Sequence, residues 1–460
     1  MMPSAPPREK VVRMYAARTT IYPRDIAGRY ATLRWLCVWL TQLVFYGLPW
    51  LRWNGRQAML FDLGERKFYL FGLVLWPQDF IYLAALLIVC AVGLFLVTAV
   101  AGRVWCGYAC PQTVYGEIFL WLERRFEGPR SERMRRDRAR ASVGNVARKV
   151  GKHIAWLLVA AWTGISFVGY FTPIDQLLEG LANWTLGPWQ LFWVGLYSLA
   201  TYGNAGWLRE QVCKYMCPYA RFQSAMFDHD TLIVSYDKGR GEPRGALGKA
   251  DGDCIDCTLC VQVCPVGIDI RNGLQYECIG CAACVDACNS VMDKVERPRG
   301  LVRYVTERGL GLHWNARQMA RRVLRPRVLI YCALWLGLCT ALATALSVRT
   351  PLKLDVLRDR GAMGRPVGDD LVENTYRLQV MNTAEHRHDF SIAVHGLTGA
   401  VVDGPAVVSV DSAGARTVAL SVRAPRQGAS VGSHPIRIEL RAIDDPALRV
   451  SEKAVFLMPR

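Results

Sequence analysis

Long apolar stretches alternate with strongly basic segments over the first three quarters of the chain. Five stretches are long enough to cross a bilayer as helices, and none of them contains lysine or arginine. They run over Trp35–Leu51, Phe80–Gly102, Ile154–Thr172, Trp189–Leu208 and Val328–Val348. This pattern predicts a polytopic α-helical membrane protein with about five spans.

The last part of the chain changes to an alternation of apolar and polar residues. Runs such as Tyr376–Met381, Phe390–Val394 and Ile436–Leu440 follow a period of two, with turn residues between them. The alternation predicts an antiparallel, immunoglobulin-like β-sandwich over residues 375–460, after a linker at 349–374. The fold class is therefore mixed, with membrane helices, a soluble insert before the last span and a C-terminal β-sandwich.

The distribution of charge predicts which side of the membrane each segment faces. The net charge is +17, and lysine and arginine number seven in residues 1–34, twelve in 102–153 and eighteen in 209–327. The loop at 173–188 has none. Because cytoplasmic loops are enriched in these residues, the basic segments are predicted inside and the C-terminal domain outside.

The first apolar stretch follows a long polar arm and lacks a small-x-small cleavage pattern, so we expect an anchor and no removable signal peptide. The basic run at 124–140 suits contact with anionic lipid, and no nucleic-acid partner is expected.

Ten segments follow from these patterns: a cytoplasmic basic arm (1–34), a transmembrane hairpin (35–102), a cytoplasmic loop with an amphipathic helix (103–153), a second transmembrane hairpin (154–208), a cysteine-containing segment (209–250), a ferredoxin-like domain (251–300), a basic linker (301–327), a fifth span (328–348), a linker (349–374) and the β-sandwich (375–460).

Eight of the sixteen cysteines form two tandem runs between the fourth and fifth apolar stretches. Each run has the spacing C-x-x-C-x-x-C-x-x-x-C, which is that of a bacterial two-cluster ferredoxin. Three thiolates of one run and the last cysteine of the other then hold each [4Fe–4S] cluster. The predicted ligands are Cys254, Cys257, Cys260 and Cys288 for cluster 1, and Cys278, Cys281, Cys284 and Cys264 for cluster 2. Structural zinc usually takes two paired ligands per half, and disulfides are rare in the cytoplasm, so both fit less well.

A second cysteine pattern, C-x-Y-x-C-P, occurs twice outside the ferredoxin-like runs. It holds Cys106 and Cys110 after the second apolar stretch, and Cys213 and Cys217 after the fourth. An amphipathic stretch follows each copy, and proline is favoured in the first turn of a helix. Each proline is therefore expected to start a helix along the inner membrane face.

Paired repeats of this kind often build one shared site at their interface. Thiolates suit iron–sulfur clusters and Cu(I), so these four cysteines are candidate copper or redox thiols. A further cluster, a copper site, a redox-active dithiol and four buried, inert cysteines all stay open as interpretations. The remaining cysteines lie within apolar stretches and are predicted to be packing residues, with the last two as a weaker possibility for a copper relay: Cys37, Cys90, Cys332 and Cys339.

Histidine is absent from all five apolar stretches, which argues against an intrinsic transmembrane haem b. No G-x-G-x-x-G fingerprint accompanies a βαβ pattern, so no nucleotide domain is expected. Electrons must then come from an unidentified donor: another protein, a flavin carrier or a membrane quinol.

The assembled features resemble the CcoG/FixG (RdxA) family of cbb(3)-type cytochrome c oxidase accessory proteins, which are polyferredoxin-like membrane proteins. The resemblance covers nearly the whole chain, including both C-x-x-x-C-P motifs, the ferredoxin-like runs and the outer immunoglobulin-like domain. It also includes Trp76–Phe80 and Tyr170–Pro173. The second run ends in Cys288-Asn289 where the first has cysteine and proline, but that proline ligates nothing.

The resemblance implies a protein of the bacterial inner membrane, with its N-terminus and ferredoxin-like domain cytoplasmic and its C-terminal domain periplasmic. It implies an oxidoreductase that reduces Cu(II) to Cu(I) during assembly of cbb(3)-type oxidase, with two [4Fe–4S] clusters on the eight cysteines. Expected partners are the lipid bilayer, copper ion, oxidase subunits or copper chaperones and transporters, and the electron donor. The role of the four C-x-x-x-C-P cysteines stays open.

Two other functions remain as alternatives. A quinol-linked conduit similar to NapH and NosR shares the C-x-x-x-C-P and ferredoxin layout, and its product is a reduced partner protein. A scaffold with purely structural clusters is the third class, and mutants in the cluster ligands would then fail only by unfolding.

Overall fold

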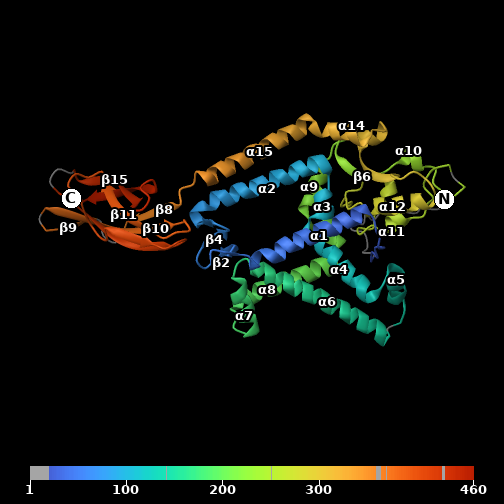
Figure 1. Cartoon of the computed structure of the whole chain (residues 1–460), viewed down its shortest axis with the longest axis horizontal. Coiled ribbons are helices and arrows are strands. Elements are labelled where there is room, and N and C mark those ends of the chain that lie inside the picture. The colour runs from blue at the N-terminus through green and yellow to red at the C-terminus, as the bar shows by residue number, and fades with distance from the viewer. Residues whose placement is uncertain are drawn as a thin grey trace, which may run out of the picture. The chain divides into compact units, whose positions relative to one another are not determined.

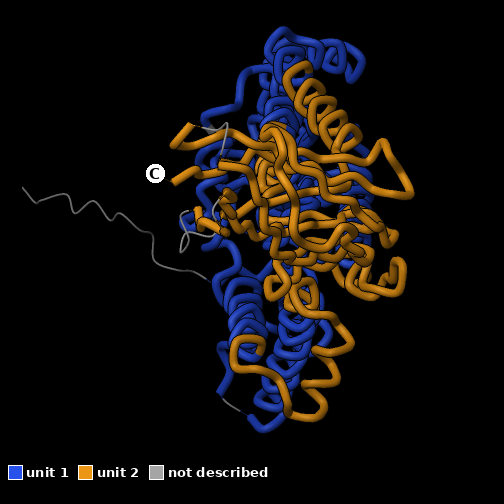
Figure 2. Tube along the Cα trace, turned by 90° about the vertical axis from the view of Figure 1, so that its left-hand side faces the viewer, with its two compact units in different colours: residues 1–44, 93–165, 191–332 blue, residues 45–92, 166–190, 333–460 orange. Residues whose placement is uncertain are grey.

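The structure is a computed structural model that describes residues 20–140, 142–249, 251–358, 364–368, 370–426 and 430–459. Residues 1–19 of the predicted basic arm lie outside the described residues. The chain divides into two compact units (Figure 2). Unit 1 comprises residues 1–44, 93–165 and 191–332, and unit 2 comprises residues 45–92, 166–190 and 333–460.

Four helices among the described residues are long and apolar enough to cross a membrane (Figure 1). They are α1 (Arg29–Gly47), which runs on into the 3₁₀ turn Leu48–Trp50, α2 (Phe80–Ala101), α6 (Val143–Val168) and α15 (Pro326–Ser347). Each overlaps a predicted apolar stretch, although α6 begins well before the expected Ile154. Large apolar side chains such as Trp39 and Ile81 are 64% and 71% exposed, which suits contact with lipid.

The fourth predicted stretch, Trp189–Leu208, departs from a regular helix. Its α-helical part, α8 (Pro188–Thr201), has only 14 residues and continues as the π-helix η3 (Tyr202–Leu208). The η3 segment contains two glycines and an asparagine, which are weak helix formers. Its carbonyls also accept bonds from elsewhere, since Gln112 Nε2 donates to the Asn204 carbonyl at 2.9 Å. The expectation of about five regular spans is therefore corrected to four long helices and this interrupted one.

Shorter helices connect these parts. In unit 1 they are α3 (Val104–Tyr108), α4 (Pro111–Glu127), α5 (Arg130–Arg138), the π-helix η4 (Val212–Met216), α9 (Pro218–Met226), α10 (Lys238–Gly241), α13 (Glu307–Gly311) and α14 (Ala316–Arg321), and in unit 2 α7 (Ile174–Ala182). The sequence patterns did not predict the small strands of unit 2, which are β1 (Arg52–Trp53), β2 (Arg56–Gln57), β3 (Met59–Asp62), β4 (Lys67–Leu70) and β5 (Leu73–Leu75).

Asp79 ties the start of α2 to the chain after α15 within unit 2. Its carboxylate is 3% exposed, accepts the Trp76 backbone N–H at 3.1 Å and pairs with Arg349 at 2.8 Å and with Lys353. Removing one partner of a buried ion pair leaves an uncompensated charge. The W-P-Q-D segment noted in the sequence therefore fixes the approach to the C-terminal domain.

The C-terminal domain is an antiparallel immunoglobulin-like sandwich, as predicted. One sheet has the order β12-β14-β10-β8, with β9 beside β10, and the other β13-β11-β15-β16. Alternate residues of both sheets, including Tyr376, Phe390, Leu420 and Ile438, are fully buried in one core. The strands are β8 (Leu352–Arg358), β9 (Arg365–Val367), β10 (Leu371–Asn382), β11 (His388–His395), β12 (Val401–Asp403), β13 (Val407–Val410), β14 (Ala415–Pro425), β15 (Gly432–Ala442) and β16 (Arg449–Met458).

The prediction of a linker at 349–374 is wrong for much of its length. The segment contains β8 and β9, and β10 starts at Leu371. β8 alternates leucine, lysine, leucine, aspartate and valine, and Leu352 and Leu354 are buried in the sandwich core. Apolar and polar residues do alternate along β8, but the strand stands beside glycine and charged residues that are typical of linkers.

The ferredoxin-like region of unit 1 is closed by two antiparallel strands, β6 (Leu232–Tyr236) and β7 (Val302–Thr306). Between them, α11 (Leu259–Gln262) and α12 (Ala283–Lys294) each carry part of one cysteine run.

Asp286, from the second cysteine run, fastens this region to the start of α1. Its buried carboxylate accepts the backbone N–H groups of Tyr30 at 3.3 Å and Ala31 at 2.8 Å. A carboxylate is favourable at a helix N-terminus because it satisfies free N–H groups there. A Cβ at Gly28 would lie 2.3 Å from Asp286 Cγ, so glycine permits the close approach.

Candidate iron–sulfur and thiol site

The eight cysteines of the ferredoxin-like runs line two separate cavities. The first cavity is lined by Cys254, Cys257, Cys260 and Cys288. The second is lined by Cys264, Cys278, Cys281 and Cys284, and Cys260 lines it as well. Each cavity thus combines three cysteines of one run with the last of the other, which is the crossed grouping that the spacing predicts.

The donor set of each cavity fits a cluster better than a single ion. Among the described residues, no three Cys, His, Asp or Glu side chains come close enough to hold one metal ion. A cubane needs wider spacing, because each thiolate binds a different iron. The four thiols of each set are therefore suited to a [4Fe–4S] cluster, although their ligand role stays a prediction.

Burial makes most of these thiols weak acids without a metal. Desolvation raises the pKa of Cys260 and Cys278 to about 11 and that of Cys264 and Cys288 to about 12. Burial also raises the pKa of Cys284 well above its ordinary value. Metal binding needs thiolates, so loading these sites must release protons.

The two cavities differ in their exposure. Cys257 of the first set is exposed, and Arg271 also lines that cavity. The second cavity contains no charged side chain, and its other lining residues are valine, isoleucine and alanine. The first set therefore has one thiol that reaches solvent and one charged neighbour, while the second set has neither.

The C-x-x-x-C-P motifs precede helices as predicted. Pro111 is the first residue of α4 and Pro218 the first residue of α9. Cys110 and Cys217 occupy the N-cap positions in extended conformation, which suits the residue before a proline. Both prolines therefore set helix starts, and their orientation to a membrane stays a prediction.

The four thiols of these motifs lie close enough to interact with one another. The Cys106 thiol interacts electrostatically with those of Cys110 and Cys213, and the Cys213 thiol with those of Cys110 and Cys217. Cys106 Sγ also lies 3.4 Å from Gln223 Oε1. Burial raises the pKa of Cys106 to about 12 and that of Cys213 to about 11. The repeat thus gathers its thiols into one four-thiol group in unit 1, in which, among the described residues, no three lie close enough to hold one metal ion.

The first motif packs directly on the loop that carries Cys281. A Cβ at Gly107 would lie 2.9 Å from Cys281 Cα and 2.9 Å from the Ile279 carbonyl oxygen. The next residue, Tyr108, has its hydroxyl 3.4 Å from that of Tyr304. No intervening layer therefore separates the four-thiol group from the second cavity.

Arg103 is a buried cation between the four-thiol group and the second cavity. It is 6% exposed, and its guanidinium donates to the carbonyls of Tyr276 and Ala220. Its charge also acts on the thiols of Cys106 and Cys278, where it favours the thiolate. Arg103 has no carboxylate partner within ion-pair distance among the described residues. The cysteine patterns do not single out Arg103, although it stands three residues before Cys106.

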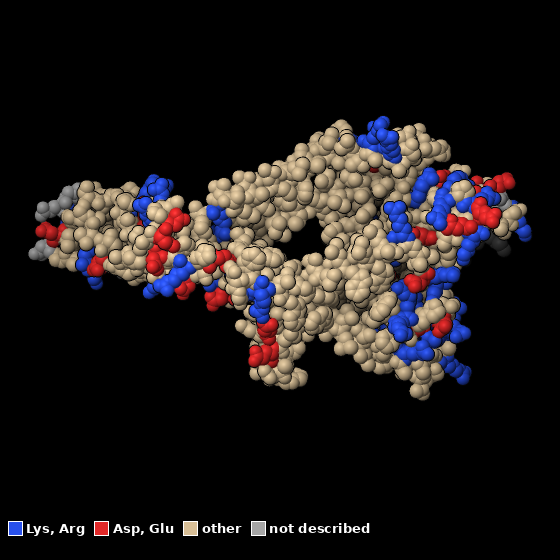
Figure 3. Space-filling view, viewed as in Figure 1, with Lys and Arg blue, Asp and Glu red and all other residues tan. Residues whose placement is uncertain are grey.

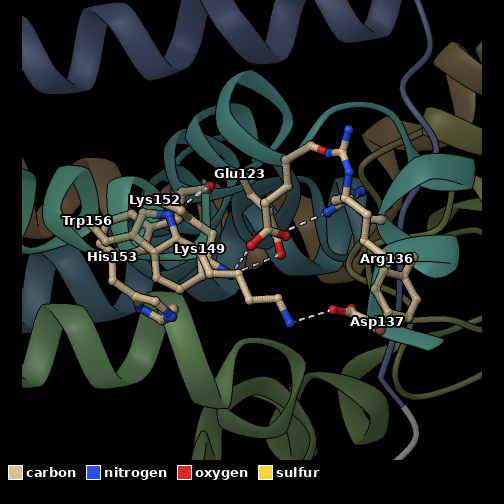
Figure 4. A network of polar contacts seen from close by, with 12 residues as sticks. Glu123, Arg136, Asp137, Lys149, Lys152, His153 and Trp156 are labelled. Carbon is tan, nitrogen blue, oxygen red and sulfur yellow. Dashed lines mark hydrogen bonds and ion pairs between the residues drawn. The ribbon is translucent and has the colours of Figure 1, made fainter. Parts of the chain in front are cut away.

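A buried ion network fixes α4 beside the second motif (Figure 4). Glu123 pairs with Arg133 at 3.0 Å, with Arg209 at 2.8 Å and with Lys152 at 3.9 Å. Buried charges are costly unless paired, so the network holds these segments in one arrangement. Arg209 lies four residues before Cys213, and the network therefore positions the second motif.

The four remaining cysteines stand apart from these two groups in the chain. Cys37 lies on α1, Cys90 on α2, and Cys332 and Cys339 on α15. Their interpretation as packing residues stays a prediction.

Family models match three parts of the chain. A 4Fe-4S dicluster domain matches residues 208–307, and a 4Fe-4S binding domain matches residues 83–129. An IG-like fold at the C-terminus of FixG matches residues 342–459. The first two matches together include both C-x-x-x-C-P motifs, and the third includes β8.

Relatives that match most of the chain point to the same family. The chain is 41% identical to protein RdxB of Cereibacter sphaeroides over 402 residues, covering 84% of each chain. It is 38% identical to nitrogen fixation protein FixG of Rhizobium meliloti over 427 residues, covering 85% of this chain and 82% of that one. The crystal structure of a FixG-related protein from Vibrio parahaemolyticus matches 24% of this chain and 97% of its own at 23% identity, with a TM-score of 0.22. With this identity over most of its length, the chain belongs to the FixG/RdxA family of iron–sulfur proteins.

Proposed function

We propose that this protein is a membrane-bound cupric reductase that supplies Cu(I) during assembly of a cbb(3)-type oxidase. The observation that carries the proposal is the contact of Gly107 with the Cys281 loop. This contact places the second cavity, which suits a [4Fe–4S] cluster that transfers one electron at a time, next to the four thiols of the C-x-x-x-C-P motifs. Reduction of Cu(II) takes one electron, and soft thiolates stabilise the Cu(I) product.

In this proposal copper is the substrate and is received by two of the four thiols of the C-x-x-x-C-P motifs, because among the described residues no three of them lie close enough to hold one ion. A [4Fe–4S] cluster on the predicted ligands would supply single electrons. The chain's own residues keep the two groups in contact: Arg103 links α9 to the loop before Cys278, and Tyr108 and Tyr304 pack across the same boundary. The buried cation also favours negative charge on either side of it.

The proposed location is the bacterial inner membrane. The excess of lysine and arginine in residues 102–153 and 209–327 supports a cytoplasmic ferredoxin-like region, and the four long apolar helices support several spans. The C-terminal sandwich would then lie in the periplasm, where it suits docking to oxidase subunits or copper carriers.

The test uses the detergent-solubilised protein, purified without oxygen and reduced with dithionite. After excess reductant is removed, Cu(II) is added with a Cu(I)-specific chelator, and cluster absorbance and EPR are followed together. We expect one Cu(I) for each cluster reoxidised. The yield should be lost in Cys106→Ser/Cys213→Ser and kept in Cys37→Ser. Clusters that stay reduced in copper would contradict the proposal.

A quinol-linked conduit is the second candidate, and one cavity favours it. Beside Cys213, the apolar side chains of Leu120, Val266 and Ile279 line a cavity. The carboxylates of Glu117 and Glu210 line it as well, together with Arg34, which pairs with Glu117 at 3.8 Å, and Arg209. Quinol oxidation releases two protons, and carboxylates can accept them. Clusters that are reduced by a quinol analogue, but not reoxidised by Cu(II), would favour this function over copper reduction.

A further inference from the structure

Four arginines surround an open cavity on unit 1 that the proposed copper chemistry does not use. The arginine patch comprises Arg24, Arg124, Arg125 and Arg130, and Trp121 and Gln262 also line the cavity. Trp121 is 48% exposed. Figure 3 shows lysine and arginine side chains gathered at the end of unit 1 where Figure 1 places α5 and α11.

The arginine patch carries a clear excess of positive charge. Among the described residues, Asp25 is the only acidic one that lines the cavity, and it pairs with Arg124 at 3.1 Å. Glu117, which is outside the lining, pairs with Arg124 at 3.7 Å. Arg130 donates to the Tyr22 carbonyl at 2.8 Å, a neutral partner. Arg24 and Arg125 are exposed and have no carboxylate within ion-pair distance among the described residues. The surface is therefore built to attract an anion or an acidic protein surface.

The arginine patch lies beside the exposed edge of the first cysteine cavity. The Arg24 backbone N–H donates to the Gln262 carbonyl at 2.8 Å, and Gln262 is the last residue of α11. The side-chain amide of Gln262 donates to the Thr258 hydroxyl at 3.1 Å. Thr258 directly follows Cys257, which is the exposed ligand candidate of the first cavity. One side chain thus separates the patch from the solvent-facing thiol.

We propose that the arginine patch docks an acidic, soluble one-electron carrier protein and holds it beside Cys257. This inference rests on the proposed electron-transfer function and names the partner that supplies its electrons. The carrier gives up one electron per encounter and leaves in its oxidised form. Charge complementarity between clustered arginines and an acidic surface speeds such encounters and weakens with salt.

The position of the patch favours a protein over lipid as its occupant. Its residues come from α4, the start of α5, the segment before α1 and the ferredoxin-like α11. An anionic bilayer would need only a flat basic surface. The cavity instead adjoins the one ligand candidate that is exposed, so a bound carrier would stand next to the first cluster site.

The experiment uses the detergent-solubilised holoprotein and reduced flavodoxin as the acidic carrier. Stopped-flow absorbance measures the second-order rate constant for cluster reduction at low and high salt. We expect Arg24→Gln/Arg125→Gln to lower this constant about tenfold at low salt and to flatten its salt dependence. Binding of oxidised flavodoxin should weaken in parallel, which is a readout independent of turnover.

The matched control is Arg317→Gln/Arg321→Gln. It removes the same charge from exposed positions on α14, away from the arginine patch. We expect it to leave both readouts unchanged. Equal effects of the two double variants, or none, would overturn the docking site. Loss of binding to phosphatidylglycerol vesicles without any change in flavodoxin kinetics would overturn it in favour of lipid.

Copper reduction driven by dithionite separates this inference from the proposed function. If dithionite-reduced wild type fails to reduce Cu(II) while the arginine variants still lose flavodoxin binding, the copper function fails and the docking site stands. If copper is reduced with dithionite but flavodoxin reacts equally with both double variants, the docking site fails alone.

Discussion

The two cysteine cavities share one ligand spacing and a mainly aliphatic lining, and they differ in the exposure of one thiol, in one charged neighbour and in the segment packed against them. The first has an exposed cysteine, Cys257, and the side chain of Arg271 in its lining. The second is lined by aliphatic side chains and has the C-x-x-x-C-P motif packed against its Cys281 loop. Cluster potential depends on solvent exposure and on nearby charge and hydrogen bonds, so the two sites should not be equivalent.

This difference suggests a direction for electron flow. An exposed site suits exchange with a partner in solution, and a buried site suits transfer to a neighbouring group within the chain. The arginine patch adjoins the first cavity, and the four-thiol group adjoins the second.

The largest expected effect is the loss of a whole cluster. Cys257→Ser and Cys281→Ser should each remove about half of the bound iron. Cys281 is buried beside Arg34, so a serine there places a more polar hydroxyl in a largely apolar site, at a further cost of about 1 kcal/mol. We expect Cys257→Ser to remain folded with one cluster and Cys281→Ser to melt at lower temperature. Iron analysis with EPR measures the first effect and a thermal melt the second. Equal melting temperatures of Cys257→Ser and Cys281→Ser would argue against a difference in burial between the two cluster sites.

Gly107→Ala should separate the motif from the second cavity. The added Cβ would meet Cys281 Cα at 2.9 Å, and overpacking of this kind costs about 1–3 kcal/mol. Heating should then bleach the second cluster before the first. The control is Gly116→Ala on α4, where a Cβ meets no atom within 4 Å. That control should be neutral or slightly stabilising, because alanine favours helix. If the second cluster lost its absorbance first in both variants, the contact between Gly107 and the Cys281 loop would be contradicted.

Arg103→Met should lower the reduction potential of the second cluster more than that of the first. The guanidinium favours the more negative, reduced state of a neighbouring centre. Coulomb's law with an effective dielectric constant of about 20 gives about 2 kcal/mol for charges roughly 8 Å apart.

EPR-monitored redox titration measures both potentials in the same Arg103→Met sample. Arg103→Lys keeps the charge and should retain most of the wild-type value. If the reduction potentials of both clusters shifted equally, Arg103 would not lie closer to the second cavity than to the first.

The smallest expected effect concerns the protonation of the four-thiol group. Burial raises the pKa of Cys106 to about 12 and that of Cys213 to about 11. The neutral thiol therefore dominates at neutral pH, and the reactive thiolate grows as pH rises towards these values. Free thiols should be alkylated about tenfold faster per pH unit between pH 7 and 9, with no plateau. Mass spectrometry of each cysteine gives the rates. A rate independent of pH would indicate that a metal already holds these thiols.

The sequence patterns predicted the grouping of the cysteines better than the ends of the helices, strands and linkers. Metal-ligand spacing is local, so the cysteine runs could be grouped without any knowledge of the fold, and the two cavities contain the predicted sets. Helix starts at Pro111 and Pro218 also followed from local conformational preference. By contrast, the sequence patterns do not separate β8 from a linker, because its short alternation stands beside glycine-rich and charged residues.

The interrupted fourth helix shows a different limit. Its apolar composition matched a span, but hydropathy is blind to backbone hydrogen bonding. The Asn204 and Gly206 carbonyls accept side-chain bonds from Gln112 and Arg209, which helps to widen the helix there. Gln112 lies 92 residues before Asn204 in the chain, so no sequence window of the usual length contains both.

By itself, the sequence determined the kinds of parts: apolar helices without charge, two ferredoxin-like cysteine runs, a repeated C-x-x-x-C-P motif and a C-terminal β-sandwich. Only the tertiary structure decided which cluster site is exposed and which site contacts the repeated motif. It also placed the Arg103 cation between two thiol groups whose cysteines are more than 100 residues apart, at 106 and 278. The physical reason is range: ligand spacing and helix periodicity act between neighbours in the chain, whereas burial, exposure and charge proximity arise only when distant segments pack.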